Sequence, residues 1–317
     1  MAAPCKRNLV IALPRDAAEA CATLEYTRDV LARAGDMVTL LHVRLADMTV
    51  KTAVPFQAVE EPLSGLADDV LLGNDEQSVA VVLQAASSLG NKASSMTLLK
   101  LRSPLRITDA LMSYITSLTD GQRDNMLLIF GSHTAASDPA TWRYASRTTL
   151  DVAAVSPVPV VIVRGASRAT NCGRRFVVLA VDGRAPTSTL LVKWACANVL
   201  SPTDTVLLCH MPTAADDEAT KQELALCDKM LLSFTAQGGK AITGHPLGSD
   251  FDVRDALVDL GQSGVAGISD GPPHLLVLAG RGPSALKRAA PLGSVCQYML
   301  CNADCPMAVV PPLALAQ

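Results

Sequence analysis

The sequence predicts an α/β protein of two tandem α/β sandwich domains, each with a five-stranded, mostly parallel sheet flanked by helices. Three observations support this prediction. Short apolar runs alternate with longer amphipathic stretches, the pattern of strands joined by helices. Hydrophobic residues make up 49% of the chain and aromatic residues only 3%, so the core is aliphatic, as suits buried parallel strands. Finally, the 317 residues are enough for two domains, and the second half of the chain resembles the first.

This internal repeat is visible in the letters. KRNLVIALPRD at 6–16 matches RRFVVLAVDGR at 174–184, and DMVTLLHV at 36–43 matches DTVLLCHM at 204–211, each 168 residues apart. MLLIFG matches LLVLA at a spacing of 148, and SPVPVVIV matches ADCPMAVV at a spacing of 147. Four matches in the same order indicate two copies of one domain.

The domain boundaries follow from the repeat. The drop in spacing from 168 to 148 predicts an insertion of 20 residues in the first copy, which fits an irregular segment at 45–74. This segment is expected to be an insertion or a flexible lid. We expect an N-terminal domain at 1–164, a linker at 165–174 that is small, polar and basic, and a C-terminal domain at 175–317.

The elements of the first half follow in order along the chain. Apolar runs predict strands at 8–13, 38–43, 96–101, 126–130 and 158–163. Helical patterns predict helices at 17–34 and 75–89, from Thr108 onward, and at 142–154. Asp16 stands where it can cap the first of these helices. In the helix from Thr108, Leu111, Ile115 and Leu118 should share one face.

The second half restarts the same pattern. Its first strand ends at Val181, its second at His210, and a further strand covers 275–278. A helix at 295–300 and a last strand at 305–310 complete the recognisable part. In parallel sheets of this kind, ligands bind at the carboxyl ends of the strands, near the point where the strand order reverses.

Composition excludes several classes of function. A net charge of −3 gives no electrostatic reason to expect DNA or RNA binding. No apolar run approaches the roughly 18–20 residues of a membrane span, and the apolar patch at 9–13 is too short for a secretory signal. The nine cysteines form no C-x-x-C pair, so we expect reduced, buried thiols in a cytoplasmic protein. A zinc site or a redox pair is the alternative.

The stretch from Leu275 to Ser294 is the strongest candidate site. A buried strand runs into the small residues Ala279, Gly280 and Gly282, and Gly293 then opens a helix. Glycines let backbone N–H groups approach an anion, and a helix N-terminus adds unpaired N–H donors and partial positive charge. The arrangement predicts a phosphate or nucleotide pocket. The alternative is an ordinary strand–turn–helix junction, which also needs glycines.

Other polar residues stand at neighbouring strand ends. Asp182 follows the first strand of the second half, where it is suited either to accept a hydrogen bond from a ligand or to cap the next helix. His210 ends the second strand, and the equivalent His42 in the first half favours a structural role. Lys287 and Arg288 lie in the glycine loop, where they face a phosphate or only solvent.

These motifs resemble the universal stress protein domain, a nucleotide-binding α/β domain, present here in tandem. The resemblance covers nearly the whole chain except 45–74 and the linker, and it is most specific at 274–310. The family has Gly, two residues, Gly, nine residues, then Gly and Ser or Thr. This chain has Ala279 at the first glycine and ten residues between Gly282 and Gly293.

The resemblance implies a site for ATP or AMP, with or without Mg²⁺, in the C-terminal domain. It implies that Asp182 and Met211 contact the base. It also implies ribose and phosphate contacts from Gly280 and Gly282, and terminal phosphate contacts from Gly293, Ser294 and Val295. Ala180 and Arg281 complete the expected set of nucleotide-binding residues.

The N-terminal domain departs further from the family motif. Pro14 stands at the aspartate position, Thr134 at the second glycine, and Ser146-Arg147 at the Gly-Ser pair. We therefore expect a degenerate copy there. Because members of the family often pair through their last strands, 158–163 and 305–310 are expected to pair within one chain as a pseudo-dimer. Whole chains pairing as a homodimer is a further possibility.

The function expected from these residues is that of a nucleotide-binding stress-response or signalling regulator and not an enzyme. No nucleophile has a neighbouring base, no metal-ligand spacing occurs, and no Walker lysine follows the glycines. Slow ATP hydrolysis would at most be incidental. The alternative is a nucleotide-free signalling or scaffold protein in which both sites are degenerate.

Overall fold

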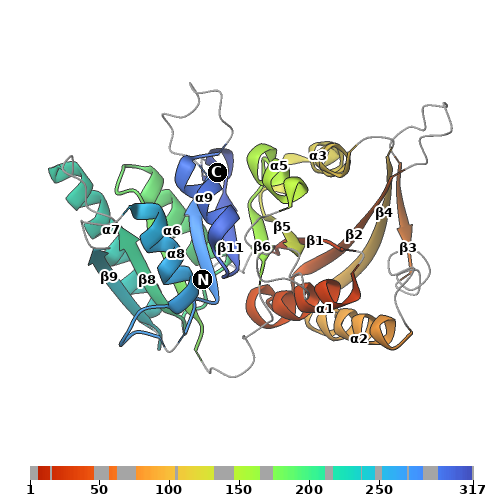
Figure 1. Cartoon of the computed structure of the whole chain (residues 1–317), viewed down its shortest axis with the longest axis horizontal. Helices are drawn as coiled ribbons and strands as arrows, with labels where there is room; N and C mark the ends of the chain where they lie inside the picture. The colour runs from red at the N-terminus through yellow and green to blue at the C-terminus, as the bar shows by residue number, and fades with distance from the viewer. Residues whose placement is uncertain are drawn as a thin grey trace. The chain divides into compact units, whose positions relative to one another are not determined.

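The structure is a computed structural model of the whole chain (Figure 1). The residues that it describes are 6–14, 16–45, 57–62, 76–103, 106–131, 146–164, 174–210, 217–236, 238–246, 252–269, 271–280 and 292–315. They divide into two compact units, one within residues 6–164 and the other within 174–315.

The described part of the first unit is a six-stranded sheet covered on both faces. Its strands are β1 (Asn8–Ala12), β2 (Met37–Leu45), β3 (Gln57–Glu61), β4 (Ser95–Ser103), β5 (Met126–Gly131) and β6 (Val160–Val163). Its helices are α1 (Ala17–Tyr26), the π-helical η1 (Thr27–Leu31), α2 (Glu76–Lys92), α3 (Ile107–Ser117), α4 (Asp120–Arg123) and α5 (Arg147–Val155). The order is β3-β4-β2-β1-β5-β6, and every neighbouring pair is parallel except β3 and β4. Helices α1 and α2 pack together on one face, and α3 and α5 on the other (Figure 1).

The described part of the second unit is a five-stranded, fully parallel sheet. Its strands are β7 (Phe176–Val181), β8 (Thr205–His210), β9 (Lys240–Pro246), β10 (Leu275–Ala279) and β11 (Met307–Val310), in the order β9-β8-β7-β10-β11. Its helices are α6 (Thr187–Asn198), α7 (Glu218–Thr235), α8 (Val253–Ser263), α9 (Ser294–Asn302) and α10 (Pro312–Leu315). Helix α6 packs with α7 and α8 with α9, on opposite faces of the sheet (Figure 1).

The predicted fold class is confirmed, and the described elements begin and end close to the predicted residues. The largest difference is β3, because the segment 45–74 was expected to be irregular. Residues 57–61 pair antiparallel with β4, although the short sequence QAVEE has no apolar face and Val59 is 41% exposed. Pairing with a free strand edge, rather than burial, therefore makes this strand. Within 45–74, Leu45 and residues 57–62 are described, and the rest of the segment lies outside the described residues.

Two helices differ in detail from the predictions. The helix predicted at 17–34 is regular to Tyr26 and then widens into η1, where the amide of Ala32 donates to the carbonyl of Thr27 at 2.7 Å. Helix α3 ends at Ser117, so Leu118 follows the helix, whereas Leu111 and Ile115 are fully buried as predicted. Asp16 caps α1 as predicted, with its carboxylate accepting from the amide of Glu19 at 2.9 Å.

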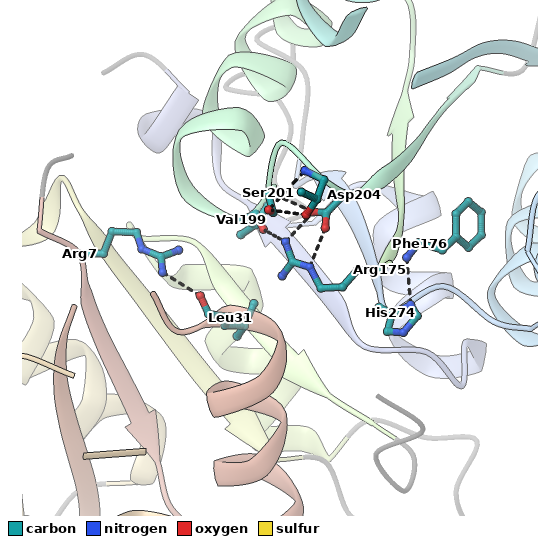
Figure 2. A network of polar contacts seen from close by, with 9 residues as sticks. Arg7, Leu31, Arg175, Phe176, Val199, Ser201, Asp204 and His274 are labelled. Carbon is teal, nitrogen blue, oxygen red and sulfur yellow. Dashed lines mark hydrogen bonds and ion pairs between the residues drawn. The ribbon is translucent and has the colours of Figure 1, made fainter. Parts of the chain in front are cut away.

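A polar network fastens the amino ends of two strands in the second unit (Figure 2). The Arg175 guanidinium, just before β7, donates to both carboxylate oxygens of Asp204, just before β8, at 2.8 and 2.5 Å. It also donates to the carbonyl of Val199, at the end of α6, at 3.2 Å. The amide of Ser201 donates to Asp204 at 2.7 Å. The network therefore ties the end of α6 to the start of the next strand.

The first unit contains the same network. Arg7 forms a two-point ion pair with Asp36 and donates to the carbonyl of Leu31 at 2.8 Å (Figure 2 shows the Leu31 contact). The amide of Arg33 donates to Asp36 at 2.7 Å. Each of these four residues stands 168 positions before its counterpart, which is the spacing of the matching sequences. The matched letters therefore occupy matched places in the two units.

Candidate functional site

The candidate site lies at the carboxyl edge of the second sheet. Strand β7 is flanked by β8 on one side and β10 on the other, so the strand order reverses there. The helix after β7 covers one face and the helix after β10 covers the other. Both helices begin at this edge, which is where parallel sheets of this type hold ligands.

Asp182 stands in a tight turn directly after β7. Its Oδ1 accepts from the amide of Arg184 at 3.0 Å and from the hydroxyl of Ser188 at 3.4 Å, and the residue is exposed. Gly183 has φ +72°, a left-handed conformation that glycine adopts without strain. Asp182 therefore holds the turn and is not the N-cap of α6, which is Pro186, and the residue is exposed.

His210 lies beneath this turn at the end of β8. The side chain is 8% exposed, and its Nδ1 is 3.3 Å from the carbonyl oxygen of Val181. The turn is closely packed: a Cβ on Gly183 would lie 2.9 Å from Cε1 of His210 and 2.7 Å from Cγ2 of Thr220, in the first turn of α7. This packing agrees with the structural role expected for His210. It also brings in Thr220, which sequence reasoning missed because only the fold joins α7 to the turn.

The two ends of the glycine loop are joined by backbone hydrogen bonds. The amide of Gly280 donates to the carbonyl of Val310 at 2.7 Å, and the amide of Gly293 donates to the carbonyl of Gly280 at 3.0 Å. A Cβ on Gly280 would lie 3.4 Å from that Val310 oxygen, an ordinary van der Waals contact. These bonds bring the start of α9 against the end of β10.

The N-cap residue of α9 supplies no side-chain cap. Gly293 is the N-cap residue and has no side chain, Ser294 is exposed, and Val295 is half-buried. The first amides of a helix have no partner within the helix. In the first unit, by contrast, the Ser146 hydroxyl caps α5 by accepting from the amide of Thr149 at 3.1 Å. The two equivalent helix starts therefore differ in whether the N-cap residue supplies a side-chain acceptor.

The carboxyl end of β5 in the first unit is filled by a carboxylate. A Cβ on Gly131 would lie 2.5 Å from Oγ1 of Thr23 and 3.1 Å from Oε1 of Glu19, both on α1. Glu19 is only 6% exposed. An acidic side chain therefore packs against this strand end. The matching position in the second unit is Thr187, again 168 residues later, which carries no charge.

The structure places six of the nine predicted site residues. Ala180, Asp182, Gly280, Gly293, Ser294 and Val295 all stand at the carboxyl ends of β7 and β10 or at the start of α9. Met211, Arg281 and Gly282 lie outside the described residues, as do Lys287, Arg288 and Thr134. Sequence reasoning also missed Glu19, because an acidic residue in the first turn of a helix reads as an ordinary favourable charge.

Four cysteine thiols of the second unit are kept protonated by burial. Burial raises the pKa of Cys209 and of Cys296 to about 12, and the pKa of Cys196 and of Cys227 to about 11, so these thiols stay protonated at neutral pH. Within the part of the chain that the structure describes, no cluster of His, Cys, Asp and Glu is arranged to hold a metal ion. Nor does any helix there have the length and apolar character needed to cross a bilayer.

Comparison with solved structures identifies the fold. The chain is similar to a universal stress protein from Archaeoglobus fulgidus, with a TM-score of 0.54 and 14% identity over 95% of this chain and 98% of that one. A putative universal stress protein from Pseudomonas aeruginosa matches with a TM-score of 0.51 and 11% identity over 99% and 96% of the two chains. A functionally unknown protein from the same species matches with a TM-score of 0.51 and 11% identity over 99% and 95%.

Comparison by sequence finds less. No family model matches the chain, and no curated protein matches it. The chain therefore has the fold of the universal stress proteins, as the sequence motifs predicted. Sequence identities of 11% to 14% support the fold alone.

Proposed function

We propose that the second unit binds an adenine nucleotide, ATP or AMP, with or without Mg²⁺, and that the protein acts as a nucleotide-dependent stress-response or signalling regulator in the cytoplasm. The observation that carries the proposal is the start of α9. Its N-cap is Gly293, with no side chain, and hydrogen bonds hold it against the end of β10. Uncapped amides and the helix dipole favour a phosphate at this position.

The contrast between the units supports one nucleotide site rather than two. In the first unit, Ser146 caps the equivalent helix and Glu19 presents a carboxylate at the equivalent strand end. Both features oppose phosphate binding. In the second unit, Asp182 is exposed beside β7. We assign to its carboxylate the hydrogen bond from the adenine amino group.

The proposed role needs binding but no chemistry. Among the described residues of the edge, the buried Cys209 and Cys296 are held as thiols by their raised pKa values. Two expectations about pairing stay predictions. One is that 158–163 pairs with 305–310 within one chain, and the other is that whole chains form a homodimer.

The Gly293→Asp variant tests the proposal by separating folding from binding. Aspartate is a good N-cap residue, and the backbone at 293, with φ −67° and ψ 149°, accepts it, so thermal stability without ligand should stay the same or rise slightly. Its carboxylate would repel a phosphate, so the Kd for ATP should rise by about tenfold or more. Titration calorimetry of the full chain with ATP and AMP measures both ligands.

The matched control is Ser146→Asp, which places an aspartate at the equivalent N-cap of the first unit and should leave the Kd for ATP unchanged. Wild-type protein should also gain thermal stability with ATP, by about 2.7 kcal/mol at a concentration 100 times Kd. If millimolar ATP and AMP change neither heat nor melting temperature in the wild type, the second candidate function, a nucleotide-free scaffold, replaces this one.

A further inference from the structure

Two side chains that the proposed function does not use pack against the turn after β7. Gly183 has φ +72°, and the atoms nearest to where its Cβ would stand are Cγ2 of Thr220 and Cε1 of His210, at 2.7 and 2.9 Å. These distances are shorter than ordinary contacts of a Cβ, so the turn rests directly on both side chains. Only a residue without a side chain fits at 183.

His210 also reaches the backbone just before Asp182. Its Nδ1 is 3.3 Å from the carbonyl oxygen of Val181, and a carbonyl oxygen can only accept. The contact is therefore a hydrogen bond when Nδ1 carries the proton. With the ring against Gly183 and Nδ1 on Val181, His210 contacts the residues on both sides of Asp182.

Thr220 is itself fixed in place. Its amide donates at 2.9 Å to the carboxylate of Asp217, which caps α7, and this hydrogen bond lowers the pKa of Asp217. On the other side, Oδ1 of Asp182 accepts from the amide of Arg184 and the hydroxyl of Ser188. The turn is thus held by the end of β8, the start of α7 and the start of α6 together.

We propose that His210, with Thr220, is a positioning residue that fixes the direction of the Asp182 carboxylate and thereby sets the preference of the site for a 6-amino purine. The inference rests on the proposed function, because it assigns a use to the orientation of Asp182. A carboxylate only accepts, so it binds the 6-amino group of adenine and repels the 6-oxo group of hypoxanthine. That discrimination depends on where the carboxylate points.

The test compares His210→Leu with His210→Asn in the full chain. Asparagine offers an amide N–H close to the place of Nδ1, whereas leucine offers none. Loss of one positioned hydrogen bond should raise the Kd for ATP by about tenfold in His210→Leu, and His210→Asn should restore most of the affinity. The ratio of the Kd values for ITP and ATP should fall in His210→Leu, which a general loss of stability would not produce.

The first unit supplies the control. His42 is the counterpart of His210, and it is as deeply buried, so His42→Leu should cost similar stability and leave both Kd values unchanged. Thr220→Ser, which removes only the methyl group at Gly183, is a milder second variant with a smaller effect in the same direction. An unchanged ITP to ATP ratio in His210→Leu and Thr220→Ser, with ATP still bound, overturns the inference and leaves the proposed function standing.

Hydrogen exchange separates the two failures. If the wild type binds neither ATP nor AMP, the proposed function fails. The rate of hydrogen exchange at the amide of Arg184 then tests whether His210 positions the turn. Faster exchange of this amide in His210→Leu than in His210→Asn would support the positioning role. Equal exchange in both variants would overturn it.

Discussion

At the scale of single residues, a few polar groups at the amino edge of each sheet connect neighbouring elements. His274, just before β10, accepts from the amide of Phe176 through Nδ1 at 3.0 Å (Figure 2). In the first unit the corresponding donor, the amide of Asn8, uses the carbonyl of Asn125 at 2.9 Å. The acceptor is thus a backbone carbonyl in the first unit and the side chain of His274 in the second. A histidine acceptor can be protonated, so the contact in the second unit depends on pH.

The first prediction at this scale concerns the pH dependence of stability. Burial, and then the positive charge of Arg175, lower the pKa of His274 below its usual 6.5. The folded protein therefore binds a proton less readily than the unfolded chain. The contribution of His274 to stability is complete above pH 6.5 and is lost as the pH falls from 6.5 towards the lower folded pKa.

His274→Asn keeps a side-chain acceptor for Phe176 and removes the titration. Urea unfolding at pH 7 and pH 5 should show a larger loss of stability in the wild type than in His274→Asn. Equal losses in the two proteins would show that His274 titrates alike in the folded and unfolded chains.

At the scale of elements, each unit joins the helix after its first strand to its second strand by the same arginine–aspartate pair. Asp204 is 1% exposed and receives bonds from Arg175 and Ser201, and Arg175 also reaches the end of α6. The repetition of the network at a spacing of 168 shows that the linked elements keep one geometry in both units.

The element-scale prediction is the cost of breaking this pair. Arg175→Ala leaves the buried carboxylate of Asp204 without its cation and should cost about 3–5 kcal/mol of unfolding free energy. The double variant Arg175→Met with Asp204→Leu should cost less, because no unpaired charge remains. Denaturant unfolding measures both; the double variant losing as much as Arg175→Ala would contradict the argument. Since the pair lies at the edge opposite the candidate site, the Kd for ATP should not change.

At the scale of the whole molecule, two units with one fold differ at the edge where a ligand would bind. One caps its helix with Ser146 and packs Glu19 against its strand end, whereas the other has Gly293 at its helix start and an exposed Asp182. Among the described residues, the asymmetry lies in the residues at the two helix starts and strand ends. A duplicated fold can in this way hold one site and one inert copy.

The whole-molecule prediction follows from this asymmetry. Saturating ATP should slow hydrogen exchange at the start of α9 and in the turn at 182–184, and leave the start of α5 unchanged. Peptide-level hydrogen exchange of the full chain with and without ATP measures this. Protection at the start of both α5 and α9 would mean that the first unit binds nucleotide as well.

The sequence by itself determined the fold class, most strands and the position of the candidate edge, because short continuous apolar runs such as 275–278 are typical of central strands and because paired letters recur at a fixed spacing. Tertiary structure alone decided three things. It made β3 by pairing at a free edge, it brought Thr220 and His210 against Gly183, and it placed Glu19 against Gly131. Each is a contact between segments distant in the chain, which no local pattern encodes.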